Sequence, residues 1–203
     1  MYIPEKFRVE DRAEILEFIR QYPFGLLLTV NDGEIDDTHT PFILSECGEY
    51  LFGHIAKANS HWKGWSDDTK AKVVFTGPHA YVSPSYYASE FNVPTWNYTA
   101  VSISGKLTVI DDEAEVLEFL DQLVIENEGS EEAWQLDRNN DNYMKLLGGI
   151  VVFKISIDTV NACFKLNQNK TSEDQHGVIS SLQKSSCPFD HGVADLMEGN
   201  REK

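Results

Sequence analysis

The sequence predicts a mainly β protein, in which an antiparallel barrel is flanked by helices. At least six segments rich in β-branched and aromatic residues follow one another along the 203 residues, and few helical segments separate them. Asn31-Asp32-Gly33 lies between two of these segments and is typical of a tight hairpin turn, because the central positions of such a turn need positive φ. A doubly wound α/β sheet would place a helix after almost every strand, so the pattern favours an antiparallel barrel edged by helices.

The first part of the chain predicts one helix and one hairpin. Residues 8–22 carry apolar side chains at helical spacing, and Asp11 supplies the negative charge that suits a helix N-terminus. The segments 24–30 and 34–44 then follow as strands on either side of the turn at 31–33. These elements start an antiparallel meander.

The rest of the chain is expected to contain further strands and three helical segments. Strands are expected at 50–55, 70–84 and 98–110, with one strand or a pair at 150–166, and helices are expected at 60–68, 111–128 and 141–149. From residue 167 the composition turns polar, which indicates helical pieces on an arm and a ragged end. We therefore expect residues 1–166 to form the barrel domain with its flanking helices, and residues 167–203 to form a C-terminal arm and tail.

The charge of the chain argues against direct binding to nucleic acid. The sequence holds 33 acidic and 17 basic residues, for a net charge of −16. Such a field repels phosphate backbones, whose neutralisation by Lys and Arg supplies most non-specific affinity for DNA. A local positive pocket for one small anion stays compatible with this field.

The composition also indicates a protein of the cytoplasm. No apolar run approaches the roughly 18 residues that a transmembrane helix needs. The first residues, "MYIPEKFRVEDRAEILEF", have neither the layout of a signal peptide nor that of a transit peptide. The three cysteines are an odd number without paired spacing, which is typical of a reducing compartment.

The stretch "GHIAKANSHW" places polar groups where a predicted strand meets a predicted helix. Lys57 supplies positive charge there, and Asn59, Ser60 and His61 supply hydrogen-bond donors. Backbone N–H groups at a helix start attract anions, so these residues predict a phosphate site. The alternative is an ordinary solvated lysine beside an Asn that caps the helix.

Two histidines are expected on neighbouring strands. His39 lies in "DTHTPF", the segment expected to pair with the strand that carries His54, and Pro41 indicates an edge or bulge there. Imidazole side chains bind zinc, ligate haem or line a flavin pocket. No further Cys, His or carboxylate at zinc-site spacing accompanies them, and "CPFDH" near the end is too short a pattern to indicate a metal site.

Residues 77–98 are expected to form a long aromatic loop. This stretch holds six aromatic residues and three prolines. Aromatic loops either pack in an interface or core, or bind a planar ligand, and both roles are compatible here. The sequence contains no nucleophile, zinc-protease or phosphate-loop motif, so any chemistry is expected to belong to a bound cofactor.

Five separated segments resemble the PaiB-type proteins, a branch of the FMN-binding split-barrel superfamily. They follow in the order and spacing of that family: "THTPF", "GHIAKANSHW", "GPHAYVSPSYY", "VPTWNY" and "KLNQNK". The resemblance runs from "MYIPEKF" to about residue 182. Ser60 stands where a proline is common, Tyr86 where a tryptophan is common, and Asn167 and Lys170 where Ser and Arg are often found. Lys170 would therefore hold a phosphate as a point charge and not as a two-pronged fork.

This resemblance implies an antiparallel FMN-binding split barrel that dimerises and holds flavin mononucleotide (FMN) in two equivalent clefts between subunits. It implies that Lys57, with Asn59, meets the FMN phosphate. It implies that three residues border the ribityl chain or ring, namely His39, Thr40 and His54. Further contacts would come from the aromatic segment and from the C-terminal strand and arm, plausibly the partner's, namely Trp96, Asn97, Lys165, Asn167, Asn169 and Lys170.

Three functions therefore compete. The first is a cytoplasmic homodimeric FMN-binding protein with a small-molecule redox or flavin-sensing role. The second is a negative transcriptional regulator, as the family label implies, acting through DNA or a protein partner, although the net charge disfavours DNA. The third is a haem-binding split barrel with a histidine ligand. The sequence assigns no catalytic residue and leaves open whether the protein is an enzyme.

Overall fold

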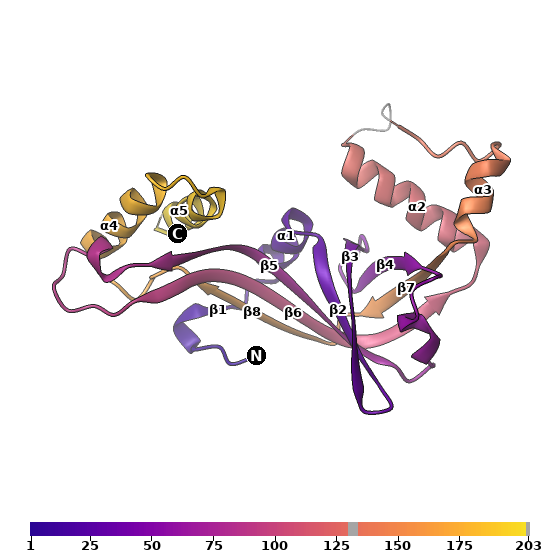
Figure 1. The fold of residues 1–203 in the computed structure, drawn as a ribbon, viewed down its shortest axis with the longest axis horizontal. Helices are drawn as coiled ribbons and strands as arrows, with labels where there is room; N and C mark the ends of the chain where they lie inside the picture. Colours follow the sequence, from indigo (N-terminus) through magenta and orange to yellow (C-terminus); the bar gives the residue numbers. More distant parts are fainter. Residues whose placement is uncertain (130–133, 202–203) are drawn as a thin grey trace. The chain divides into compact units, whose positions relative to one another are not determined.

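The computed structural model describes residues 1–129 and 134–201 (Figure 1). In this part of the chain there are eight strands, five α-helices and three short 3-10 helices. The strands are β1 (Arg8–Val9), β2 (Phe24–Asn31), β3 (Glu34–Leu44), β4 (Tyr50–Ala56), β5 (Lys70–Val82), β6 (Thr95–Ile110), β7 (Ile150–Ser156) and β8 (Thr159–Lys165). The helices are α1 (Arg12–Gln21), α2 (Glu113–Glu128), α3 (Asp141–Leu147), α4 (Ser172–Gln183) and α5 (Pro188–Arg201), with 3-10 helices η1 (Glu5–Phe7), η2 (His61–Gly64) and η3 (Pro84–Tyr86).

The strands form one sheet in the order β1-β8-β6-β5-β2-β3-β4-β7, and β6 also pairs with β7. The second pairing links six strands into a ring. The registered pairs are antiparallel, including β2 with β3, β3 with β4 and β4 with β7. The predicted mainly β, antiparallel fold with flanking helices is therefore confirmed. None of the helices within the described ranges is long and apolar enough to cross a membrane.

The chain forms two compact units, and β5, β6 and β8 contribute residues to both. Unit 1 comprises residues 1–18, 76–102 and 161–203, and unit 2 comprises residues 19–75 and 103–160. Each unit is described by itself below. The predicted division into residues 1–166 and 167–203 stays a prediction.

Unit 2 contains the predicted hairpin and a core of aromatic side chains. Asp32 and Gly33 have φ of 50° and 86°, the left-handed conformations that a tight turn needs and that glycine adopts without strain. Behind the hairpin, the ring of Phe42 lies 5.5 Å from that of Phe75 and 6.1 Å from that of Phe153. The edge-to-face packing of these buried rings fixes how β3, β5 and β7 meet.

Helix α2 covers part of this unit with an apolar face. Phe119 is buried in a cluster with Ile43, Ile110 and Val152. The Asp112 side chain accepts a hydrogen bond from the Glu115 N–H and caps the first turn of the helix. The predicted helix 111–128 is therefore confirmed almost to its ends.

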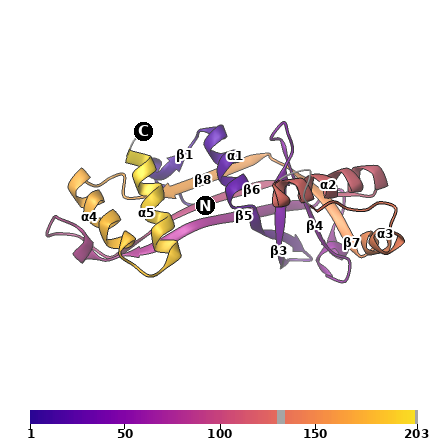
Figure 2. The same cartoon turned by 90° about the horizontal axis from the view of Figure 1, so that it is seen from above.

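Unit 1 contains the β1 and β8 pair and the C-terminal helices. Arg8 of β1 pairs with Cys163 of β8. Helices α4 and α5 pack side by side (Figure 2) and bury apolar residues along their length, namely Val178, Ile179, Leu182, Val193, Ala194 and Met197. The expected helical pieces after residue 167 are confirmed, but the expected ragged end is an ordered helix up to Arg201.

The expected loop at 77–98 is strand at both ends, and only its middle part is a loop. β5 continues to Val82 and β6 begins at Thr95, which leaves only residues 83–94 as the connection. The aromatic residues and prolines indicated a loop because they do not alternate as simple buried strands do. The structure shows that Tyr81 and Trp96 occupy outward positions of two long strands, where large exposed side chains are unusual.

Candidate functional site

In the corner after β4, the backbone N–H and the backbone carbonyl of Lys57 are both hydrogen-bonded. Its N–H donates to the Gly149 carbonyl at 2.7 Å, and its own carbonyl accepts from the Trp62 indole N–H at 3.0 Å. The side chain is exposed, and no acidic group in residues 1–129 and 134–201 pairs with its ammonium. The corner therefore presents a free positive charge from a fixed backbone position.

A buried polar network lies beside this corner. His61 is 3 % exposed, and its ring nitrogens are 2.8 Å from the hydroxyls of Thr29 (Nε2) and Thr38 (Nδ1). The Asn59 amide N–H donates to the Thr38 hydroxyl at 3.0 Å, and its Oδ1 accepts from the His61 backbone N–H at 2.9 Å. The Asn59 side chain thus shapes the turn. It is not the cap residue of η2, a four-residue 3-10 helix, because Ser60 holds that position and makes no side-chain capping hydrogen bond.

The surroundings of His61 favour the neutral form of its imidazole. Burial lowers its pKa, and the carboxylates of Asp36 and Asp37 oppose that shift. From the sequence, His61 was expected only to supply a local hydrogen-bond donor. The signal for its role was the alternation on the hairpin: Leu27 pairs with Thr38 and Thr29 pairs with Asp36, so both threonines lie on one face of β2 and β3.

The predicted pairing of the two histidine strands is confirmed, but the two rings contact different residues. Phe42 pairs with Gly53 across β3 and β4, and the Thr40 hydroxyl donates to the His54 carbonyl at 2.6 Å. The exposed His39 ring stacks at 5.9 Å on Phe24.

The His54 ring lies 5.9 Å from the Phe119 ring, and burial lowers its pKa. Among the residues that the structure describes, its buried Nδ1 has no hydrogen-bond partner. Within the described ranges, no group of three or more His, Cys, Asp or Glu side chains is arranged to hold a metal ion. His54 therefore offers one unused hydrogen-bonding atom beside an aromatic ring.

In unit 1, the ammonium of Lys165 is bound by acceptors of the protein itself. It donates to the Thr95 hydroxyl and, at 2.8 Å, to the Trp96 carbonyl. Burial lowers the pKa of Lys165, and the nearby Lys6 lowers it further, while Cys163 opposes the shift. The Trp96 ring is 54 % exposed and lies near the rings of His79 and Tyr81, at 6.2 and 6.1 Å.

Asn97 is sealed inside unit 1. It is 0 % exposed, and its amide N–H donates only to the thioether of Met197 on α5, at 3.4 Å. In the described part of the chain, its Oδ1 is buried without a hydrogen-bond partner, as is the hydroxyl of Thr99 two residues along β6. In this arrangement the Asn97 side chain contacts α5 and is closed to solvent.

The residues after β8 hold the connection between β5 and β6. Asn167 is buried with φ of 60°, and its amide donates to the Tyr87 hydroxyl at 3.3 Å. The Lys170 ammonium donates to Asn92 Oδ1 at 2.5 Å and lies 5.0 Å from the Tyr87 ring centre. Asn169 is exposed.

Asp174 at the start of α4 fixes the same connection. Its carboxylate accepts from the backbone N–H of Ser89 at 2.9 Å and from the Ser89 hydroxyl at 3.0 and 2.9 Å. These bonds lower the pKa of Asp174. A Cβ on Gly177 would lie 2.3 Å from the Tyr86 carbonyl oxygen, so this position needs glycine for α4 to approach η3.

The predicted site residues thus belong to two groups. Unit 2 holds the group of His39, Thr40, His54, Lys57 and Asn59, and unit 1 holds the group of Trp96, Asn97, Lys165, Asn167, Asn169 and Lys170. The charge of the unit 2 group suits a phosphate, because the Lys57 ammonium is exposed and has no acidic partner in the described ranges, whereas Nδ1 of His54 is buried. In unit 1, Trp96 and Asn169 are exposed. The other four side chains of this group form hydrogen bonds within the protein.

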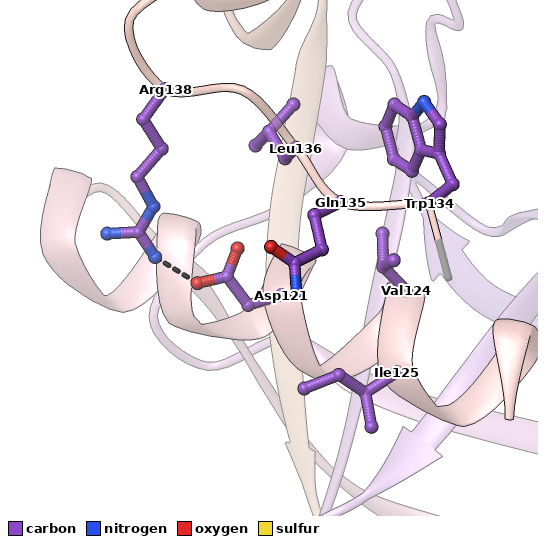
Figure 3. Close-up of a pocket in the computed structure, with 7 residues that line it drawn as sticks. All are labelled: Asp121, Val124, Ile125, Trp134, Gln135, Leu136 and Arg138. Carbon is purple, nitrogen blue, oxygen red and sulfur yellow. Dashed lines mark hydrogen bonds and ion pairs between the residues drawn. The ribbon is translucent and has the colours of Figure 1, made fainter. Parts of the chain in front are cut away.

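The pocket between α2 and residues 134–138 contains none of these residues (Figure 3). It has a volume of about 260 Å³ and is lined mainly by Val124, Ile125, Trp134 and Leu136. Its charged end is neutralised, because Arg138 pairs with Asp121. The sequence analysis did not predict this pocket.

Comparison with known proteins identifies relatives along the whole chain. Residues 1–159 match the model of a family described as "Putative FMN-binding domain". The chain is 35 % identical over 208 residues to the protease synthase and sporulation protein PAI 2 of Bacillus subtilis (strain 168), which covers 100 % of this chain and 99 % of the relative.

Two solved structures resemble the fold. The FAD and heme binding protein from Mycobacterium smegmatis has a TM-score of 0.64 at 17 % identity and covers 83 % of this chain and 78 % of its own. The flavocytochrome Anf3 from Azotobacter vinelandii has a TM-score of 0.62 at 17 % identity, with coverage of 84 % and 74 %. At these identities the likeness concerns the fold alone, and it confirms the predicted split-barrel type.

Proposed function

Since the chain belongs to the family of FMN-binding domains, as its resemblance to the PaiB-type proteins predicted, we propose that it is itself a flavoprotein that binds FMN. The observation that carries this proposal is the family match over residues 1–159, which includes the Lys57 corner. The free ammonium of Lys57 suits the dianionic phosphate of FMN. His39, Thr40 and His54 would border the ribityl chain or the ring.

The proposed site has a second part in unit 1. Trp96 is exposed and offers an aromatic face to a planar ring. Asn169 is exposed and offers a donor, whereas Lys165, Asn167 and Lys170 would act by holding the segment that carries them. Asn97 contributes through the packing of α5.

We propose that the protein works as a homodimer in which the unit 1 residues of one subunit complete the site of the other. Large apolar side chains at the surface of unit 1 support this proposal. Phe91 is 96 % exposed and Val93 is 69 % exposed, in the connection that Asp174 holds. Surfaces of this kind are typical of protein–protein interfaces.

The isoalloxazine ring of FMN supplies redox chemistry when it is bound. The residues described here bind and orient the cofactor, and no side chain in the described ranges is assigned as a proton donor or acceptor for a substrate. The proposal is therefore a flavoprotein with a small-molecule redox or flavin-sensing role.

A regulatory role is the second candidate, and the full-length similarity to the B. subtilis protein favours it, since the name of that protein refers to sporulation and protease synthesis. With a net charge of −16, such a role would act through a protein partner more readily than through DNA. A flavin that senses a metabolite is compatible with both candidates.

Titration of the purified apo-protein with FMN, followed by flavin fluorescence, tests the proposal. We expect saturable binding and the flavin absorption bands in the complex. A protein that takes up haem with a Soret band and does not bind FMN would replace the proposal with the haem-binding alternative. Light scattering at several concentrations tests the dimer, and a monomer that binds FMN at full strength would contradict the shared site.

A further inference from the structure

We propose that Thr29, Thr38 and His61 form a positioning network that orients Lys57 toward the phosphate of its ligand. The inference rests on the proposed FMN function and assigns a role to residues that do not touch the cofactor. Thr29 and His61 are 2 % and 3 % exposed, so neither offers a surface to a ligand. Any effect of Thr29 and His61 on binding must therefore pass through the corner that the network supports, and Thr38, which is half-buried, links them to it.

The hydrogen bonds of the network form a consistent chain. The Thr38 oxygen accepts from the Asn59 amide at 3.0 Å, which leaves the hydroxyl proton of Thr38 for Nδ1 of His61 at 2.8 Å. When Nδ1 accepts that proton, the proton of the neutral ring lies on Nε2 and is donated to the Thr29 hydroxyl at 2.8 Å. In this tautomer both ring nitrogens of His61 are paired.

The same network closes onto the backbone of the corner. The Asn59 Oδ1 accepts from the His61 N–H at 2.9 Å, and the Asn59 N–H donates to the Ala56 carbonyl at 2.9 Å. Residue 56 ends β4 and residue 61 begins η2, so these two bonds span the turn that contains Lys57.

The residue after His61 completes the connection. The Trp62 indole donates to the Lys57 carbonyl at 3.0 Å, and the Lys57 N–H is bound to Gly149. A shift of His61 would therefore move η2 and, with it, the backbone carbonyl of Lys57. Preorganised donors bind a ligand more tightly because less order has to be created on binding.

A double-mutant cycle with FMN as the probe tests this inference. Thr38→Val removes the hydroxyl at nearly constant volume, and Lys57→Met removes the charge. We expect Thr38→Val to weaken FMN binding about five- to tenfold, the scale of one lost hydrogen bond in a buried network. In the Lys57→Met background the same change should have almost no effect, because the network acts through the ammonium that is now absent.

Two matched variants complete the design. Thr38→Ser keeps the hydroxyl and should restore FMN binding to near the wild-type value. Thr108→Val makes the same chemical change at an exposed position of β6 and should leave binding unchanged. The ¹⁵N spectrum of His61 in the apo-protein gives a second readout, since loss of the Thr38 hydroxyl should alter the tautomer balance.

The outcomes separate this inference from the proposed function. If the wild-type protein binds FMN and the effects of Thr38→Val and Lys57→Met on that binding are fully additive, the positioning role is overturned and the FMN proposal stays intact. A wild-type protein that binds no FMN would overturn both. If Thr38→Val does not fold, Thr29→Val at the other end of the network carries the same cycle with the same expectation.

Discussion

The Lys57 corner of unit 2 and the Lys165 to Lys170 segment of unit 1 both present lysines, but the lysines differ in what they contact. The Lys57 backbone is bound on both sides and its ammonium is free of acidic partners in the described ranges. The ammonium groups of Lys165 and Lys170 are bound by Thr95, the Trp96 carbonyl and Asn92. Within the described ranges, the same residue type therefore exposes an ammonium without an acidic partner at the corner and forms hydrogen bonds inside the protein in unit 1.

The sharpest test of this difference is the loss of charge at the corner. We expect Lys57→Ala to weaken FMN binding by about 1.5–3 kcal/mol, the range for a hydrogen bond to a charged group. The thermal unfolding transition should be unchanged, because the exposed ammonium has no partner to lose. Lys63→Ala in η2 is the matched control and should retain affinity. Equal losses in both variants would point to a general electrostatic effect and remove Lys57 from the site.

The complementary change in unit 1 should act on stability. We expect Lys165→Met to lower the free energy of unfolding by about 0.5–1.5 kcal/mol, since it removes the hydrogen bonds to Thr95 and Trp96. Denaturation in urea measures this effect, and FMN affinity should fall less than in Lys57→Ala. A variant of full stability that has lost FMN binding would show that Lys165 contacts the cofactor directly and that the two units do not differ in this way.

The two regions should also respond to pH in different windows. Burial lowers the pKa values of His54 and His61 in unit 2, so the unfolded chain binds protons there before the folded chain does. Their contribution to stability is full above the ordinary histidine pKa of 6.5 and is lost as the pH falls through the lowered pKa values. We expect the loss between pH 7.5 and 5.5 to be smaller in His61→Gln, measured by urea denaturation at each pH.

In unit 1 the sensitive group is a carboxylate. The bonds from Ser89 and Thr171 lower the pKa of Asp174, so its stabilising effect is present above the ordinary aspartate value and is lost as the pH falls through the lowered one. Between pH 7.5 and 5.5, Asp174→Asn should therefore show the same pH slope as the wild type. If the unfolding free energy of Asp174→Asn changes with pH differently from that of the wild type in this window, the loss of stability attributed to the histidines comes from another group.

The smallest expected effect concerns DNA. At about 150 mM salt, we expect the purified protein to give no sequence-specific shift of duplex DNA, because counterion release has weakened contacts that lack a matched basic surface. The chain has a net charge of −16, and the free lysine of the corner is a single charge. A salt-resistant footprint on a defined promoter would move the regulatory candidate ahead of the flavoprotein.

Local chemistry determined much of the fold. Asn31-Asp32-Gly33 forms the predicted turn because the positive φ values of Asp32 and Gly33 are a property of those residues themselves. The helix after Asp112 begins where an Asp can cap it, and α1 follows its apolar spacing. The Lys57 corner was also visible in the sequence, because it lies within ten consecutive residues, Gly53 to Trp62.

Tertiary packing decided which predicted site residues are available to a ligand. Asn97 is covered by Met197, which lies 100 positions later in the chain, and the Tyr87 hydroxyl that binds Asn167 is 80 positions earlier. His61 obtained its role from Thr29 and Thr38, which are 32 and 23 positions away. The sequence by itself determined the turns, caps and amphipathic faces, because these depend on neighbouring residues. Only the tertiary structure decided which polar side chains are free, because a hydrogen-bond donor is occupied by whatever the fold brings beside it.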